Sequence, residues 1–341
     1  MKYFLSVIIV SIFLVQCQTK KGDQKSDDRS GRYQTTGSIE RLDPSLNKII
    51  PEDANIEILA TGFSWSEGPL WIPELGALVF SDIPENSVYK WTASDSIQLY
   101  LKPSGYSGDS KKEKREPGSN GLILDKENRL ILCQHGDRQI GRMKAELSNP
   151  VPEYEIVAEN YEGLRFNSPN DIVMNSLGEF FFTDPPYGLD EWNIKELDFQ
   201  GVYKITTGEE VHLLIDSLSR PNGIGLSPDE KTLYVAVSDP GRARYYSYAM
   251  DEEGRIVNGK MILDVTNMIS KDRKGLPDGM AVHSSGNLFA TGPGGVLVIG
   301  PNGKHLGTIL TGHATANCTF NEDESTLYIT ADMHLMRVQL K

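Results

Sequence analysis

Cysteine, histidine and net positive charge are all scarce in this sequence. Its 341 residues include 3 cysteines and 6 histidines. No His/Cys set has the spacing of a zinc site, which argues against a closed zinc centre. The 34 Lys and Arg residues face 47 Asp and Glu residues, for a net charge of -13. Nucleic-acid binders need a basic face, so that class of protein is not expected. An acidic surface instead suits solubility and cation binding.

Long apolar runs are missing too, with one exception at the N-terminus. Lys2 is followed by a mostly apolar run from Tyr3 to Val15 and then by Gln16-Cys17. This run is too short for a membrane span and is typical of a secretory signal. The segment Leu14-Val15-Gln16-Cys17 resembles a bacterial lipobox, although Gln16 replaces the usual small residue.

We therefore expect residues 1–17 to be a lipoprotein-type signal peptide that ends at a lipidated Cys17. The protein would then be exported and anchored to a membrane, facing the periplasm or the cell surface. The alternative is a signal peptide cleaved elsewhere, with Cys17 incidental. Residues 18–40 lack apolar periodicity and are rich in Lys, Asp, Ser and Gly, which predicts a flexible tether. The other two cysteines, Cys133 and Cys318, lie in β-like runs, so no disulfide framework is expected.

A short segment recurs through the rest of the chain, residues 41–341. Each copy has a polar lead residue, usually a small residue next, then a short apolar run, a turn and a second apolar run. The lead residues lie about fifty residues apart, a period typical of solenoids and propellers. The copies begin at Glu67, Asn120, Asn170, Asn222, Asp278 and, more weakly, Asn317.

The apolar runs between these lead residues predict strands rather than helices. They are short, β-branched or aromatic, and bounded by Gly, Asp, Asn and Pro. Four antiparallel strands in each of six units make an all-β fold, the six-bladed β-propeller. The last copy supplies only three strands, so we expect Ile56–Leu59 to add the fourth and close the ring. The alternative is a chance array of hairpins in a β-sandwich.

The innermost strand of each blade lines the central channel of a propeller, so the lead residues should ring one mouth of that channel. An Asn or Asp before Gly is often only a turn residue. Glu67 is not explained in that way, because Glu is not favoured in turns. Two carboxylates and several carboxamide oxygens at one point form a hard-oxygen site, which suits Ca²⁺ or Mg²⁺, with Mn²⁺ as a further candidate.

Five segments together resemble a known family. They are Glu67-Gly68-Pro69-Leu70-Trp71, Ser168-Pro169-Asn170-Asp171, Phe182-Thr183-Asp184-Pro185-Pro186-Tyr187-Gly188, Arg220-Pro221-Asn222-Gly223 and Pro277-Asp278-Gly279-Met280. They look like the gluconolactonase/regucalcin (senescence-marker-protein-like) family of six-bladed propeller lactonases. The diisopropylfluorophosphatase and paraoxonase propellers are more distant relatives. The resemblance extends from residue 55 to 341 and covers all six predicted blades.

The resemblance implies a divalent cation at the channel mouth, most commonly Ca²⁺, with Mg²⁺, Mn²⁺ or Zn²⁺ as alternatives. The family's ligand positions match Glu67, Asn170, Asn222 and Asp278 here. The cation would polarise a lactone carbonyl and position a water molecule. Asp278 would be a catalytic residue, as a ligand only or also as base or nucleophile. A neighbouring cation lowers the pKa of a carboxylate, which favours the ligand role.

Further candidates surround this predicted metal site. Asn120, at a lead position beside the ligands, is expected to contact the substrate. Tyr187 follows two prolines and is expected at the rim, with loop packing as the alternative. His313 is a loop histidine that could also reach the mouth.

The ends of the second strands should return to the same mouth as the lead residues. Among them, His135 is the titratable group suited to neutral pH. We expect it to bind substrate hydroxyls or to carry a proton, and the alternative is a partly buried histidine that caps the second blade. The predicted strand ends are Asp82, His135, Asp184, Asp239, Pro293 and Asp332.

The leading hypothesis is therefore a monomeric, metal-dependent hydrolase of sugar lactones, with a small-molecule substrate and no nucleic-acid partner. Hydrolysis of aryl esters or phosphotriesters would use the same metal chemistry. A non-catalytic binding propeller with a structural calcium would carry the same ligands. Substrate choice would depend on the rim loops 102–117 and 188–200, of which the first is charged and rich in Gly and Ser.

Overall fold

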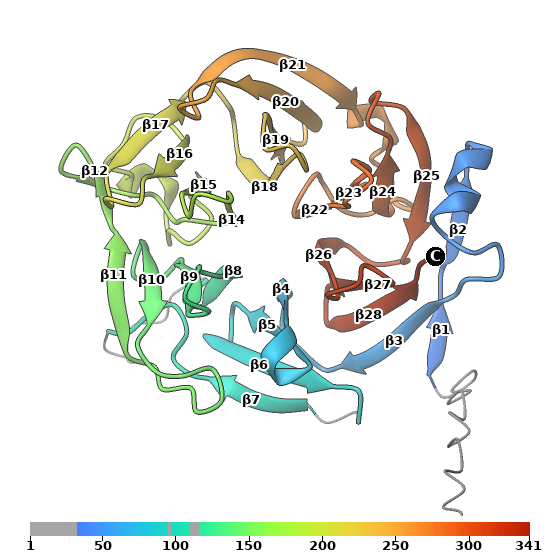
Figure 1. The fold of residues 1–341 in the computed structure, drawn as a ribbon, viewed down its shortest axis with the longest axis horizontal. Coiled ribbons are helices and arrows are strands. Elements are labelled where there is room, and N and C mark those ends of the chain that lie inside the picture. Colours follow the sequence, from blue (N-terminus) through green and yellow to red (C-terminus); the bar gives the residue numbers. More distant parts are fainter. Residues whose placement is uncertain (1–32, 95–96, 109–115) are drawn as a thin grey trace, which may run out of the picture. The chain divides into compact units, whose positions relative to one another are not determined.

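Six antiparallel sheets stand around a central axis, each running outward from that axis (Figure 1). They belong to a computed structural model that describes residues 33–94, 97–108 and 116–341. The predicted signal peptide, Cys17 and residues 18–32 of the predicted tether lie outside these ranges. Within them, no helix is long and apolar enough to cross a membrane. The predicted six-bladed β-propeller is confirmed.

Four of the sheets have four strands, in which sequence order follows the order from the axis outward. Blade 1 consists of β4 (Ser66–Ile72), β5 (Ala77–Asp82), β6 (Ser87–Thr92) and β7 (Ile97–Leu101). Blade 2 consists of β8 (Ser119–Leu124), β9 (Leu130–Gln134), β10 (Gln139–Met143) and β11 (Tyr154–Ala158). Blade 3 consists of β14 (Ile172–Met174), β15 (Phe180–Asp184), β16 (Gly201–Ile205) and β17 (Val211–Ile215). Blade 4 consists of β18 (Pro221–Leu226), β19 (Thr232–Val237), β20 (Arg244–Met250) and β21 (Ile256–Asp264).

The other two sheets have five strands, because N-terminal strands join their outer edges. Blade 5 consists of β22 (Met280–Val282), β23 (Leu288–Gly292), β24 (Gly295–Ile299), β25 (His305–Leu310) and β2 (Ser38–Arg41). Blade 6 consists of β26 (Thr315–Phe320), β27 (Thr326–Ala331), β28 (His334–Gln339), β3 (Ile56–Thr61) and β1 (Gln34–Thr36).

Short elements decorate the connections between these strands. A two-stranded hairpin precedes blade 3, and four short 3₁₀ helices lie in loops. They are β12 (Asn160–Tyr161), β13 (Leu164–Arg165), η1 (Pro44–Lys48), η2 (Pro73–Leu75), η3 (Trp192–Ile194) and η4 (Thr266–Met268).

The core lies between neighbouring blades rather than at the axis. Each of the six blade–blade interfaces has its own apolar cluster. Between blades 2 and 3, for example, Ile131 and Cys133 pack with Phe180, Phe182 and Tyr203. Since both faces of an inner sheet are covered, its middle strands are apolar at consecutive positions, as in β9, where every residue is buried.

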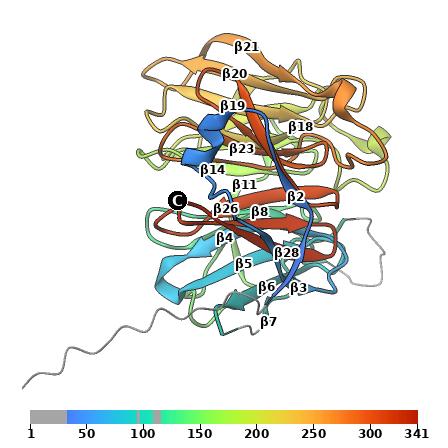
Figure 2. The ribbon, with the colours of Figure 1, turned by 90° about the vertical axis from the view of Figure 1, so that its right-hand side faces the viewer.

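The ring is closed by β3, which pairs antiparallel with β28 at the C-terminal end of the chain. The pairing places Glu57 opposite Arg337, and the Arg337 Nε atom lies 2.6 Å from Glu57 Oε2. The predicted closure by residues 56–59 is therefore confirmed. In the side view, β2 and β3 run along the C-terminal strands (Figure 2).

The predicted tether was wrong for its last residues. Residues 34–36 pair with β3, and residues 38–41 pair with β25 of the next blade. Gly37 makes this change of blade at φ +57, and a Cβ there would lie 1.8 Å from the carbonyl oxygen of Leu310. An edge strand needs backbone pairing more than an apolar face, so the hydropathy pattern did not reveal β1 or β2.

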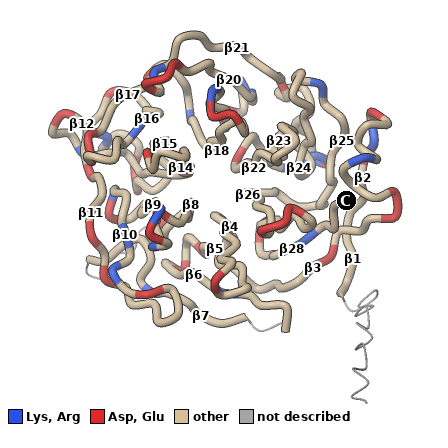
Figure 3. Tube along the Cα trace, in the orientation of Figure 1, with Lys and Arg blue, Asp and Glu red and all other residues tan. Residues whose placement is uncertain are grey.

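Lys and Arg residues are scattered around the ring instead of gathering on one blade (Figure 3).

Candidate metal centre and active-site cavity

The six lead residues lie at the same end of the innermost strands. Four of them lie within β4, β8, β18 and β26, and Asn170 and Asp278 lie just before β14 and β22. In those four strands the pairing with the second strand shifts register at or beside the lead residue. Such bulges turn a side chain away from the sheet. All of the lead residues except the partly buried Asp278 are between 2 and 5 % exposed: Glu67, Asn120, Asn170, Asn222 and Asn317.

Hydroxyl groups on the second strands fix the backbone of the lead residues in the next blade. Ser81 of β5 donates to the carbonyl oxygen of Asn120 at 2.9 Å, and Thr183 of β15 donates to that of Asn222 at 2.6 Å. Both hydroxyl-bearing residues are fully buried. These bonds set the distance between neighbouring inner strands at the level of the lead residues.

The small residue after a lead residue allows close approach of the neighbouring inner strand. Gly68 has φ +45, and a Cβ on it would lie 2.0 Å from the carbonyl oxygen of Asn120. In the third copy the same place is taken by Asp171, which is 7 % exposed. Its Oδ1 accepts a hydrogen bond from the Ile172 N–H at 3.0 Å. This position therefore adds a third carboxyl group to the inner ring.

A cavity of about 570 Å³ opens at the lead-residue end of the channel, and we call it the central cavity. Five lead residues line it: Glu67, Asn120, Asn170, Asn222 and Asp278. The sixth, Asn317, does not. The rest of the lining consists of Ser64, Trp65, Ile83, Pro84, Glu116, Tyr187, Arg220, Ser238, Gly275, Leu276, Ala314 and Thr315. The structure thus brings the four predicted metal ligands and the predicted substrate contacts Asn120 and Tyr187 to one cavity.

The carboxyl groups of this ring repel one another. Burial raises the pKa of Glu67 to about 8, and the charges of Asp171 and Glu116 contribute. The pKa of Asp278 is raised well above its usual range. Burial is the largest cause, and repulsion from Glu67 and Asp171 adds to it. The pKa of Asp171 is raised to about 7, again by burial. A cation between them would favour the deprotonated form of all three.

Asn317, the lead residue of the weaker sixth copy, does not line the central cavity. Its Oδ1 accepts from the N–H of Cys318 at 2.8 Å, so its amide nitrogen is the group left to face the ring. The side chain hydrogen-bonds to the carboxyl groups of Glu67 and Asp171 and lowers the pKa of each. Asn317 therefore orients two carboxyl groups of the inner ring.

The donor atoms in the central cavity fit a hard divalent cation. The Oδ1 atoms of Asn120 and Asn222 are buried without a hydrogen-bond partner among the described residues. Buried oxygens of this kind are rare unless they bind a water molecule or an ion. No three His, Cys, Asp or Glu side chains converge as a metal site in the described ranges. An ion here would therefore depend on carboxamide oxygens, the ligand type of calcium sites.

His135 is fully buried and does not line the central cavity. Its Nδ1 atom lies 3.4 Å from Oε2 of Glu116, which does line the cavity. The backbone of Gly188 packs against it, since a Cβ on that glycine would lie 2.7 Å from the His135 Cβ. The geometry connects His135 to the cavity through Glu116, whereas direct contact with a substrate stays a prediction.

Two of the predicted strand-end residues brace loops. Asp82 accepts hydrogen bonds from the N–H groups of Ser64 and Trp65, both at 3.0 Å. Asp184 accepts from the N–H groups of Asn167 and Ser168, both at 2.7 Å. Neither aspartate lines the central cavity. Each one fixes the segment that leads into the inner strand of its own blade.

Other predicted residues have mixed outcomes. Tyr187 lines the cavity. His313 does not line it, and its Nδ1 atom lies 3.7 Å from Oδ2 of Asp332. Sequence reasoning missed Glu116 and Arg220, which both line the cavity. Glu116 ends a loop without a recognisable pattern, and Arg220 directly precedes the Pro221-Asn222 pair, where it was treated as part of the motif.

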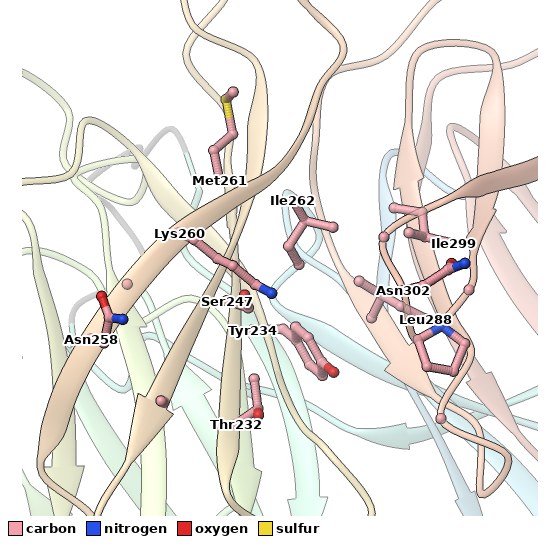
Figure 4. A pocket seen from close by; sticks show the side chains of 16 residues that line it. Thr232, Tyr234, Ser247, Asn258, Lys260, Met261, Ile262, Leu288, Ile299 and Asn302 are labelled. Atoms are coloured by element: carbon pink, nitrogen blue, oxygen red, sulfur yellow. The ribbon is translucent and has the colours of Figure 1, made fainter.

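A second hollow is lined by residues of blades 4 and 5 (Figure 4). Its volume is about 380 Å³, and its lining includes Tyr234, Lys260 and Asn302 but no Asp, Glu or His. The central cavity, in contrast, brings carboxyl and carboxamide groups together, and it is the candidate active site.

The fold and the central cavity define a six-bladed propeller with acidic and carboxamide side chains at one mouth of its channel. The sequence profile of the "SMP-30/Gluconolactonase/LRE-like region" matches residues 65–332, which include all of the lead residues. The chain belongs to this family.

Individual relatives agree with this assignment. The chain is 36% identical over 344 residues to a gluconolactonase of Zymomonas mobilis, covering 98% of this chain and 95% of that protein. A solved gluconolactonase of Xanthomonas campestris superposes with a TM-score of 0.77 at 29% identity, over 91% of this chain and 97% of that chain. A solved regucalcin of Agrobacterium tumefaciens, described as calcium-binding, has a TM-score of 0.66 at 19% identity, over 83% of this chain and 94% of that chain. At that identity the last similarity concerns the fold alone.

Proposed function

We propose that this protein hydrolyses sugar lactones of the gluconolactone type and that it depends on a divalent cation, with Ca²⁺ as the first candidate. The observation that carries the proposal is the central cavity, in which the lead residues contribute two carboxylates and three carboxamides at one mouth of the channel. Similarity to a gluconolactonase over nearly its whole length supports the substrate class.

Glu67, Asn170, Asn222 and Asp278 are the side chains that would hold the cation. When bound, it would act as a Lewis acid toward the ester carbonyl and would balance the buried carboxylates. Asp278 serves as a ligand, because a neighbouring cation makes its carboxylate a weak base. Asn120, with its unpartnered Oδ1, orients the substrate beside these ligands.

Glu116 is the carboxylate placed to move a proton. It lines the cavity without being one of the four proposed ligands, and His135 lies beside it. The water oxygen bonds to the carbonyl carbon while Glu116 takes one proton from that water. The bond from the carbonyl carbon to the ring oxygen then breaks, and Glu116 returns the proton to the departing oxygen. The product is an open-chain acid with a new hydroxyl group.

The proposal is tested by following acid release from δ-gluconolactone with a pH indicator. We expect rates well above spontaneous opening, loss of the enzymatic rate after treatment with EDTA, and recovery on adding Ca²⁺. Mg²⁺, Mn²⁺ and Zn²⁺ would be compared in the same assay. A full rate in the Asp278→Ala variant would contradict the catalytic role of this site. The same treatment of an aryl ester and a phosphotriester would show whether either is the preferred substrate.

We also propose export and membrane anchoring through Cys17, supported by the apolar run at residues 3–15 and the lipobox-like segment that follows it. Labelling of cells with a fatty-acid analogue should mark the parent and not a Cys17→Ala variant. Labelling of both proteins would contradict the anchor at this position.

A further inference from the structure

Tyr187 and Arg220 form part of one wall of the central cavity, and the Trp192 ring packs against both of them. Tyr187 follows β15, Trp192 begins η3, and Arg220 immediately precedes β18. The guanidinium carbon of Arg220 lies 4.9 Å from the centre of the Trp192 ring, and the Trp192 and Tyr187 ring centres are 6.0 Å apart. Tyr187 also hydrogen-bonds to Ser238, another residue of the lining. This wall is therefore a connected unit, and cation–π contact orients the arginine within it.

The backbone of Arg220 is fixed in an unusual conformation. Its φ is +53, in the left-handed region that side-chain-bearing residues seldom adopt. Its N–H donates to Gln200 Oε1 at 2.7 Å, and its carbonyl oxygen accepts from the Ser238 N–H at 3.0 Å. Strain of this kind persists where the surroundings impose it, commonly at functional sites. The backbone conformation sets the direction of the Arg220 Cα–Cβ bond relative to the proposed ligand Asn222.

The guanidinium of Arg220 has no hydrogen bond or ion pair to any residue in the described ranges. Each of the other arginines in those ranges has at least one side-chain hydrogen bond or ion pair. In Arg242, on the same blade, the Nη2 atom lies 3.6 Å from Oδ2 of Asp239. Arg220 is half-buried and lines the cavity. Because the side chain is only half-buried, its N–H groups are free to donate to a molecule in the cavity. A ligand in the cavity would supply the missing acceptors.

We propose that Arg220, backed by Trp192, donates hydrogen bonds to the hydroxyl groups of the substrate and so selects sugar lactones over unsubstituted lactones. This rests on the proposed lactonase function and adds the residue that sets its specificity. Neutral hydroxyls fit better than an anionic group, because Glu67, Glu116 and Asp278 line the same cavity and would repel an anion. Sites built to bind a hydroxyl discriminate strongly against analogues that lack it.

The test compares δ-gluconolactone with δ-valerolactone, which has the same ring ester and no hydroxyls. For Arg220→Met, we expect kcat/KM for δ-gluconolactone to fall by about 10- to 100-fold, with the rate for δ-valerolactone unchanged. Arg220→Lys keeps the charge without the planar fork and should lie between the parent and Arg220→Met. Arg242→Met removes an arginine of the same blade and should leave both rates unchanged. Equal loss for both lactones, or no loss for δ-gluconolactone, would overturn the proposal.

A binding measurement separates this proposal from the proposed function. Ligand-observed NMR with 1,5-anhydroglucitol, a ring with the same hydroxyls and no ester, reports recognition without chemistry. We expect the parent protein to bind it and Arg220→Met to lose binding, whether or not either lactone is hydrolysed. Equal binding by both proteins would refute the role of Arg220 even if lactonase activity were found. Thermal unfolding of each variant checks that the fold is intact.

Discussion

The hydroxyl of Thr183 donates a hydrogen bond to the carbonyl oxygen of Asn222 at 2.6 Å, and so connects the second strand of blade 3 to the lead residue of blade 4. Thr183 is fully buried, and it does not line the central cavity. The bond therefore determines the position of a proposed metal ligand from outside the site.

Replacing Thr183 by Val keeps the shape and removes this donor. We expect Ca²⁺ affinity to fall by about 10-fold, since partners of ligands commonly contribute that much. Titration calorimetry measures the change, and Thr207→Val, at an exposed position, provides the matched control. Unchanged affinity in Thr183→Val would show that blade 3 does not set the position of Asn222.

Glu67→Gln should weaken Ca²⁺ binding by about 100-fold while the propeller stays folded, because ligand charge tunes affinity at oxygen sites. In chelator, its thermal midpoint should not fall below that of the parent. The reason is that the variant removes a carboxyl group whose pKa burial raises to about 8. Glu127→Gln, at an exposed position, is the control. Parental metal affinity in Glu67→Gln would mean that the site has been placed wrongly.

Glu116→Gln should lower kcat by about 100-fold or more while Ca²⁺ affinity is retained, since it removes the proposed base and no ligand. Glu85→Gln, an exposed residue bonded to Ser64 near the same mouth, should keep the parental rate. A variant of Glu116 that loses metal instead of turnover would reassign this residue as a ligand.

We propose that His135, whose Nδ1 atom lies 3.4 Å from Glu116 Oε2, positions the Glu116 carboxylate. His135→Ala should therefore lower kcat with little change in KM, and His135→Asn, which retains an N–H near the Nδ1 position, should restore part of the rate. Steady-state kinetics on the two variants separate this role from packing. If both variants lose activity and thermal stability to the same extent, the histidine serves only to fill the blade.

Asp184 predicts a pH dependence of stability. Burial raises its pKa to about 7 in the folded protein from an ordinary value of 3.8. Stabilisation from this group is therefore fully present below the ordinary value and is lost as the pH rises through about 7. The free energy of unfolding of Asp184→Asn, relative to that of the parent, should increase between pH 5 and pH 8 in urea titrations.

Asp82→Asn is the matched comparison, because Asp82 has the same bracing role in blade 1 and its pKa is also raised by burial. We expect a change in the same direction for this variant. No relative gain for Asp184→Asn at high pH would show that the carboxyl is ionised in the fold at little cost.

Repetition explains which features the sequence could predict. The period of the lead residues predicted the six blades, the closing strand and the meeting of Glu67, Asn170, Asn222 and Asp278 in one cavity. Each of these depends on a position that recurs in every blade. The same positions place the lead residues at the innermost strands, which explains why their side chains are buried.

Glu116, Arg220 and the role of Asp171 depend on features that occur only once. Glu116 reaches the cavity from a loop, and the direction of Arg220 depends on a left-handed φ and on Trp192 in another loop. Strands β1 and β2 were missed because edge pairing needs no hydropathy pattern. His135 lies beside the cavity-lining Glu116, and its burial depends on Gly188, whose backbone packs against it.

Finally, the seam at β3 has a mechanical consequence. β1 pairs with the outer edge of β3, the strand that closes the ring. β2 pairs with β25 at the outer edge of the adjacent blade. A tensile load applied at Tyr33 would first peel short edge strands, one bond pair at a time, before it reached the joint between β3 and β28. Separation of β1 and β2 would thus absorb the load first, and the pairing of β3 with β28 would be the last to break.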